Sequence, residues 1–218
     1  MKTGGGSRLP RVRIPLLPPS TSRIFMGKYE QDYIDIIYSS DLLTDVLGRL
    51  EKLMKTLGTE DYLLSGGAVY QTVWNHVLSK DPHYGLKDLD VVYYDNDTSK
   101  QKEIRVSGLV QKELAHQKYP VEAVNQARVH QWYKETYGFE CRELVSLEDA
   151  VGSWMVACCC IGIRKEGKKL IVFAPYGLDD IFNLIIRPNN KTEKSRDIYY
   201  EKAEKWLAKW PELTVLPW

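Results

Sequence analysis

The sequence has no apolar run that approaches the ~20 residues of a membrane-spanning helix, so no membrane segment is expected. It also lacks the C-x-x-C spacing of zinc and redox sites, because three of its four cysteines, Cys158, Cys159 and Cys160, are consecutive. Neighbours on a strand point to opposite faces, so these three thiols are not expected to bind one metal ion. Because free cysteine is usually buried, we expect them to be buried and reduced. With no recognisable secretory signal, they favour a reducing, cytoplasmic location.

The body of the chain lacks the basic excess that is typical of nucleic-acid-binding proteins. The net charge is +1, but residues 1–29 hold six of the 30 basic residues and none of the 29 acidic ones. The remainder therefore carries 24 basic and 29 acidic residues, and no basic stripe or nucleic-acid module is visible in it. A small molecule is accordingly favoured over a long nucleic acid as the partner.

The N-terminal segment lacks the composition of a regular element. Residues 1–25 contain three glycines and four prolines, which prevent both a helix and a strand. They are expected to form a flexible basic arm that the fold does not need. Residues 26–218 have the length of one ordinary domain.

Hydrophobic periodicity in this domain predicts helices that alternate with short strands. Ser40 is the expected N-cap of a long amphipathic helix, and Gly167 the turn of a hairpin. This order favours an α/β fold with a mixed sheet and flanking helices. The strands are expected within 61–65, 88–95, 119–124, 155–164 and 169–175, and the helices within 33–39, 41–57, 68–79, 99–118, 147–154, 176–187 and 195–210.

Ser65, Gly66 and Gly67 stand where the first strand passes into a helix. One interpretation is a tight turn. The other is a phosphate site, because glycine lets a ligand approach the backbone and a helix N-terminus offers N–H groups and a positive dipole end. Ser65 would add a hydroxyl donor.

Three acidic residues strengthen the second interpretation. Asp88 and Asp90 are two positions apart at a strand, so both carboxylates face the same way and repel each other unless a cation lies between them. Mg²⁺ prefers such carboxylate oxygens together with substrate phosphates. Glu122 lies in the apolar run "YPVEAV", where a carboxylate should be paired or bind metal. The alternative for each is an exposed strand end.

This order of glycines, Asp-x-Asp and a later acid resembles the DNA polymerase β-type nucleotidyltransferase superfamily, and within it a branch described as nucleotidyltransferase-like. The blocks that carry the resemblance span residues 66–190 and read "GGAVYQTVWN", "KDLDVVYYD", "PVEAVNQARVHQWY", "SLEDAVGSW" and "APYGLDDIFNLIIRPN". The resemblance implies that Ser65, Gly66 and Gly67 hold a triphosphate, and that Asp88, Asp90 and Glu122 bind two Mg²⁺ ions.

The implied reaction transfers a nucleoside monophosphate from a nucleoside triphosphate, with ATP as the expected donor, to an acceptor that the sequence does not identify. Two departures from the branch motivate an alternative. Tyr70 stands where the branch commonly has Arg, and Asn75 where it commonly has Asp. A basic contact to the phosphates is therefore in doubt, and the protein could bind nucleotide without catalysis. A third interpretation is an interaction protein in which the glycines only turn the chain.

Three further residues are candidates for substrate contacts. Asn125 and Arg128 closely follow the strand of Glu122, where Arg128 could bind a phosphate or form a structural ion pair. Tyr176 could line a pocket, or its segment "APYGLDD" could simply begin a helix with Asp179 and Asp180 at the positive end of the dipole. Trp132, Trp154, Trp206 and Trp210 are expected to close the core.

Overall fold

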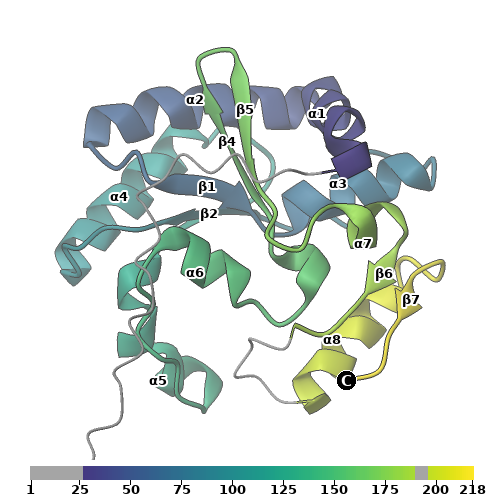
Figure 1. Ribbon diagram of the computed structural model, residues 1–218. Coiled ribbons are helices and arrows are strands. Elements are labelled where there is room, and N and C mark those ends of the chain that lie inside the picture. The colour runs from purple at the N-terminus through teal and green to yellow at the C-terminus, as the bar shows by residue number, and fades with distance from the viewer. Residues whose placement is uncertain (1–26, 190–195) are drawn as a thin grey trace, which may run out of the picture.

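A mixed five-stranded sheet lies at the centre of the computed structural model, which describes residues 27–189 and 196–218 (Figure 1). Its strand order is β3-β2-β1-β4-β5, in which only β2 and β3 run parallel. This confirms the predicted fold class, while the predicted arm of residues 1–25 lies outside the described ranges. The strands are β1 Tyr62–Ser65, β2 Leu89–Tyr93, β3 Val121–Asn125, β4 Gly162–Glu166 and β5 Lys169–Phe173.

Helices cover both faces of this sheet. In Figure 1, α1 and α2 lie above it and α5, α6 and α8 below it. The helix α4 connects the parallel strands β2 and β3, a connection that parallel pairing requires. The helices are α1 Glu30–Ser39, α2 Asp41–Leu57, α3 Gly67–Val77, α4 Lys100–Glu113, α5 Tyr133–Tyr137, α6 Leu147–Gly152, α7 Asp179–Phe182 and α8 Arg196–Leu207, with short 3-10 turns η1 Gly27–Tyr29, η2 Gln126–Gln131 and η3 Ala157–Cys159.

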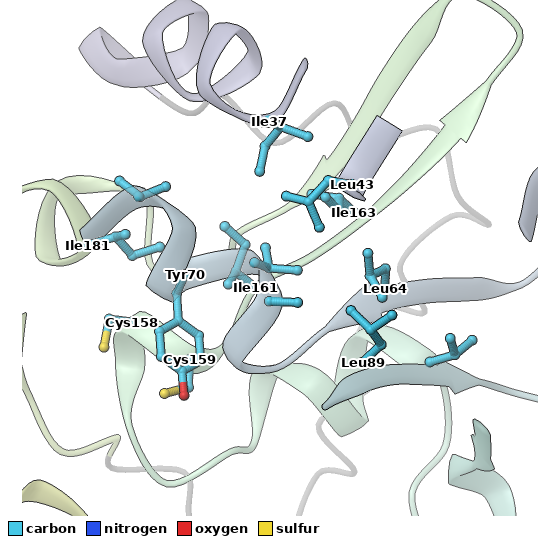
Figure 2. Packing of buried hydrophobic residues seen from close by; sticks show 14 of the residues in the cluster. Ile37, Leu43, Leu64, Tyr70, Leu89, Cys158, Cys159, Ile161, Ile163 and Ile181 are labelled. Carbon is cyan, nitrogen blue, oxygen red and sulfur yellow. The ribbon is translucent and has the colours of Figure 1, made fainter. Parts of the chain in front are cut away.

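Alternation along the strands decides which side chains enter the main core. Leu64, Val91 and Ile163 point into the large cluster shared with α1, α2 and α3, and Figure 2 shows part of this packing. Leu63 and Val92 point to the other face, where they pack with α6. Side chains point to the same face at every second position of a strand, so Asp90 lies on the α6 side with Val92. The prospective site therefore lies on the sheet face opposite the main core.

The predicted N-cap Ser40 is observed, and Ser146 caps α6 in the same way. The Ser40 hydroxyl accepts a hydrogen bond from the Leu43 N–H at 3.3 Å, and the Ser146 hydroxyl accepts one from the Asp149 N–H at 3.0 Å. Each satisfies a backbone donor that the first turn of a helix leaves free.

The strand predicted through the cysteines is wrong. Ala157–Cys159 form the 3-10 turn η3 and Cys160 ends it, so the backbone bonds are local, as in Cys160 N–H to the Ala157 carbonyl. A continuous apolar run does not distinguish a buried strand from a buried turn. Burial is nevertheless confirmed, because all three cysteines are at most 3% exposed.

Two very short strands were not predicted. β6 Ile185–Ile186 pairs in parallel with β7 Thr214–Val215. This pairing holds the segment after α8 against the segment after α7. Two-residue strands are too short to show a period. Within the described ranges, no helix has both the length and the apolar character needed to cross a membrane.

The tryptophans divide into two groups. Trp206 and Trp210 are buried as predicted, together with Trp74. Trp132 and Trp154 are half-buried. Both pack against hydrophobic core clusters, and both also line a cavity.

Candidate active site

Gly66 joins β1 to α3 in a conformation that only glycine adopts readily. Its φ is 69° and its ψ is −158°. A Cβ atom at this position would lie 1.9 Å from Oδ2 of Asp90. The missing side chain therefore lets the Asp90 carboxylate lie against the backbone at the N-terminus of α3. Gly66 is thus needed both for the turn and for the close approach.

Gly67 is the first residue of α3 and is less constrained. A Cβ there would meet only the side chain of Gln71, at 2.8 Å from Nε2. Within the described residues, no side chain caps this helix, so its first N–H groups face the turn without a side-chain acceptor.

Ser65 is placed differently from Gly66 and Gly67. It is fully buried, and its hydroxyl donates a hydrogen bond to the carbonyl of Ile161. This hydroxyl proton is committed to the junction of β1 with β4. Gly66 and Gly67, in contrast, line the cavity that contains the carboxylates.

The three predicted carboxylates line one cavity of about 810 Å³. Asp90 is paired in register with Ser65 on β1 and with Glu122 on β3, so Asp90 and Glu122 stand side by side on one face of the parallel pair. Asp88 directly precedes β2, two positions from Asp90. Asp90 therefore lies beside Gly66 with Glu122 on the same face. The expected convergence of all three carboxylates to metal-bridging distance is not observed among the described residues.

The electrostatics of this wall are unfavourable for a second ionised group. Burial, and then the negative charges of Asp88 and Glu122, raise the pKa of Asp90 to about 7, while Lys202 acts in the opposite direction. Asp90 is thus a carboxylate whose ionisation a nearby cation would favour.

The carboxylates are a suitable donor set for a divalent cation, but they are not a preformed ligand cluster. Within residues 27–189 and 196–218, no three His, Cys, Asp or Glu side chains are close enough together to hold a metal ion. Carboxylate oxygens next to the glycine backbone of Gly66 and Gly67 fit Mg²⁺ that is bound together with phosphates. Cation binding would have to draw the side chains closer.

Two walls flank the carboxylates, and neither was predicted. One is the α8 wall, which we define as Lys202, Lys205, Trp206 and Lys209. Its lysines recur at steps of three and four residues, with Lys202 and Lys205 on one side of α8 and Lys209 in the turn that follows the helix. This spacing was a usable signal, but it resembles an ordinary solvated helix face.

The other wall is the ring cluster, which we define as Trp132, Tyr133, Tyr137 and Phe139, and which belongs to α5 and its flanks. The ring centroids of Tyr133 and Tyr137 are 4.6 Å apart, and those of Tyr133 and Phe139 are 5.4 Å apart. The aromatic content of this segment was the signal, yet a short irregular stretch shows no period that would orient the rings.

The remaining predicted contacts point into the protein. Asn125 is 1% exposed and accepts hydrogen bonds from the Ala127 and Asp95 N–H groups. Arg128 forms an ion pair with Glu103. The Tyr176 hydroxyl donates to the Gly152 carbonyl at 3.1 Å or to Asn189 Oδ1 at 2.8 Å. All three thus have partners within the protein, and they are not among the residues that line the cavity of the carboxylates.

Tyr70 and Asn75, the two departures from the family pattern, are both buried. Tyr70 lines the cavity and extends toward Cys159 in Figure 2. The Asn75 amide donates to the carbonyls of Pro82 and Tyr84, and its oxygen accepts from Trp210 Nε1 at 2.9 Å. Asn75 thus connects α3 to the loop before Asp88 and to the end of α8.

Comparisons with known proteins identify a family and a fold for this chain. A family described as nucleotidyltransferase matches residues 52–215. A solved structure described as revealing a CCA-adding enzyme head domain superposes with a TM-score of 0.70 at 24% identity, covering 86% of this chain and 96% of that one. It establishes a shared fold. A solved structure of a tRNA-processing enzyme complex matches at 16% identity, and the match covers 73% of this chain and 40% of that one. Its TM-score of 0.43 is too low to establish a shared fold.

No curated protein matches the chain. The family match covers well over half of the residues and includes the glycine turn and all three carboxylates. The chain belongs to this family of nucleotidyltransferases.

Proposed function

We propose that the protein transfers a nucleoside monophosphate from a nucleoside triphosphate, with ATP as the first candidate, to a hydroxyl acceptor. The observation that carries the proposal is the contact geometry at Gly66, where the Asp90 carboxylate lies against the N-terminus of α3 and beside Glu122. A site for phosphate and a site for cations thus share one wall. Mg²⁺ bound there would neutralise the phosphates and polarise the α-phosphoryl group.

The chain's own residues have distinct roles in this reaction. The N–H groups at Gly67 and the start of α3 would hold phosphate oxygens. Asp88, Asp90 and Glu122 would hold the cations, and Lys202 would face the phosphates from the α8 wall. The basic contact that Tyr70 fails to supply would therefore come from α8.

The reaction conserves atoms and charge in a simple way. The acceptor oxygen forms a bond to the α-phosphorus, the bond from this phosphorus to the oxygen that bridges to the β-phosphate breaks, and pyrophosphate leaves. The acceptor proton passes to a carboxylate of the wall or to water.

The alternative is a nucleotide-binding protein without catalysis. It is favoured by Tyr70, an uncharged residue that lines the cavity where the branch commonly has Arg. The presence of all three carboxylates favours catalysis. Release of pyrophosphate distinguishes the two functions.

Calorimetry with Mg²⁺ and each of ATP, GTP, CTP and UTP tests the proposal. Binding is expected for at least one nucleotide, dependent on Mg²⁺ and lost in the Asp88→Ala, Asp90→Ala double variant. Asp95→Ala is a matched control, since Asp95 pairs with Lys102 outside the cavity. No Mg²⁺-dependent binding at millimolar nucleotide, or equal binding by the double variant, would show the proposal to be wrong.

A further inference from the structure

The ring cluster forms an aromatic surface at one end of the cavity. Tyr137 is 55% exposed, and its ring centroid lies 6.4 Å from that of Trp132 at an interplanar angle of 45°. Tyr133 lies between the Tyr137 and Phe139 rings at tilted and edge-on angles. An exposed ring held by half-buried neighbouring rings is pre-organised to receive a planar ligand, because little side-chain freedom is lost on binding.

This surface lies close to the carboxylates. Tyr137 lines the same cavity as Asp90 and Glu122. In Figure 1, α5 and α8 lie on opposite sides of the region below β1 and β2. Since both helices line the cavity, the carboxylates have the ring cluster on one side and the α8 wall on the other.

The two ends of the cavity differ in available positive charge. At the ring end, Lys134 pairs with Glu140, and Arg142 forms two hydrogen bonds to Asp149 at 2.6 Å. At the other end, Lys205 pairs with Glu201. Lys202 has no carboxylate within ion-pairing distance among the described residues, and its Nζ lies 5.0 Å from the Trp206 ring centroid. Polyphosphate therefore belongs at the α8 wall, and the ring end suits an uncharged group.

In-line displacement sets the direction of attack. The attacking oxygen and the leaving pyrophosphate lie on opposite sides of the α-phosphorus. If pyrophosphate leaves toward the α8 wall, the acceptor hydroxyl approaches from the ring cluster.

We infer that the ring cluster is the acceptor subsite and takes a small, uncharged hydroxyl compound that carries a planar aromatic or heteroaromatic ring. The inference rests on the proposed function. The ring of the acceptor stacks on Tyr137 and its hydroxyl points toward Asp90 and Glu122, where its oxygen forms the new bond to phosphorus and pyrophosphate departs.

Calorimetry on the full chain tests this subsite. Mg²⁺-dependent nucleotide binding is measured first, and the protein is then saturated with Mg²⁺ and α,β-methylene ATP, which cannot transfer its nucleotide. Adenosine, uridine and 2-phenylethanol are added separately, with a short oligoadenylate as a polyanionic comparison. The variants are Tyr137→Ala and the ring-preserving Tyr137→Phe. Tyr38→Ala is the control, since Tyr38 is a 37% exposed tyrosine of α1 outside the cavity.

At least one ring compound is expected to bind the wild type, Tyr137→Phe and Tyr38→Ala alike. Its affinity should fall about tenfold in Tyr137→Ala, the order expected for losing one stacked ring. Nucleotide binding by Tyr137→Ala should stay unchanged, which also shows that this variant folds.

Several outcomes would overturn the subsite while nucleotide binding is intact. They are indifference to all three compounds, equal affinity for Tyr137→Ala, or tighter binding of oligoadenylate than of adenosine. Loss of nucleotide binding in Tyr137→Ala would assign the rings to the base of the nucleotide instead. Absence of Mg²⁺-dependent nucleotide binding in the wild type overturns the proposed function, and the acceptor assignment with it.

Discussion

At the residue scale, Gly66 and Asp90 form one unit. We predict that Gly66→Ala lowers the free energy of unfolding by at least about 2 kcal/mol, because the backbone has a positive φ and the new Cβ would collide with Asp90 Oδ2. Gly67→Ala is the matched control. There the new methyl group meets only a glutamine side chain, and alanine favours the helix, so a change within about 1 kcal/mol is expected. Urea unfolding compares the two, and equal losses would contradict the difference.

The raised pKa of Asp90 makes stability depend on pH. The unfolded chain holds this carboxyl near its ordinary value of 3.8, whereas the folded value is about 7. Between these values the native state binds a proton that the unfolded state has lost. The contribution of Asp90 to stability therefore falls as pH rises through this window and stays low above it.

We predict that Asp90→Asn is more stable than the wild type at about pH 8, and that its advantage shrinks toward about pH 4. The amide removes a buried negative charge that lowers the free energy of unfolding. The difference between pKa values of 3.8 and about 7 corresponds to a few kcal/mol. Thermal unfolding without metal measures both proteins at each pH. Asp32→Asn, an exposed change on α1, is the control. An advantage that grows as the pH falls would contradict the shift.

At the scale of elements, Asn75 links α3, the loop before Asp88 and the end of α8. We predict that Asn75→Ala lowers the free energy of unfolding by at least about 2 kcal/mol, because it leaves the buried indole N–H of Trp210 and two carbonyls without their partner. Asn183→Ala is the control, since it removes only an exposed hydrogen bond to Asp179 within one helix. Guanidinium unfolding measures both, and similar losses would show that the link is unimportant.

Elements with a clear period were predictable. The helix α2 buries Leu43, Val46, Leu47, Leu50 and Met54 at steps of three and four, and Ser40 caps it as expected. The run from Met155 to Ile161 was misread because its residues are buried irrespective of direction, so no period distinguishes η3 from a strand. The short strands β6 and β7 exist only through their mutual pairing, which local sequence does not encode.

At the scale of the whole molecule, the carboxylate wall was predictable and the opposite walls were not. Asp90 and Glu122 occupy neighbouring strands and Asp88 directly precedes the first of them, so strand order brings all three to one cavity wall. Lys202 lies 112 positions from Asp90 in the sequence, yet its charge acts to lower the pKa of Asp90. Trp206 and Trp210 pack against Trp74 and so hold this part of the chain beside α3. Ser65 is adjacent to Gly66 in sequence and was therefore predicted to contact phosphate. Its hydroxyl instead donates to the carbonyl of Ile161, a contact that the local sequence does not reveal.

The two walls should act on different substrates, and this separation is testable. We predict that Lys202→Gln weakens Mg²⁺-nucleotide binding about tenfold, because it removes a charge facing the phosphates, and that it leaves binding of the ring compounds unchanged. Tyr137→Ala should do the reverse. Calorimetry of each variant and of the double variant measures both affinities, with Lys55→Gln, an exposed change on α2, as the control for charge.

Independent walls predict that the two losses add within about 0.5 kcal/mol in the double variant. Added salt should also weaken nucleotide binding less in Lys202→Gln than in the wild type, because one screened charge contact is gone. If Lys202→Gln reduced the affinity for the ring compounds as strongly as for the nucleotide, the two ends of the cavity would bind one ligand together. The division between a phosphate wall and an acceptor wall would then be wrong, even with the carboxylates in their proposed role.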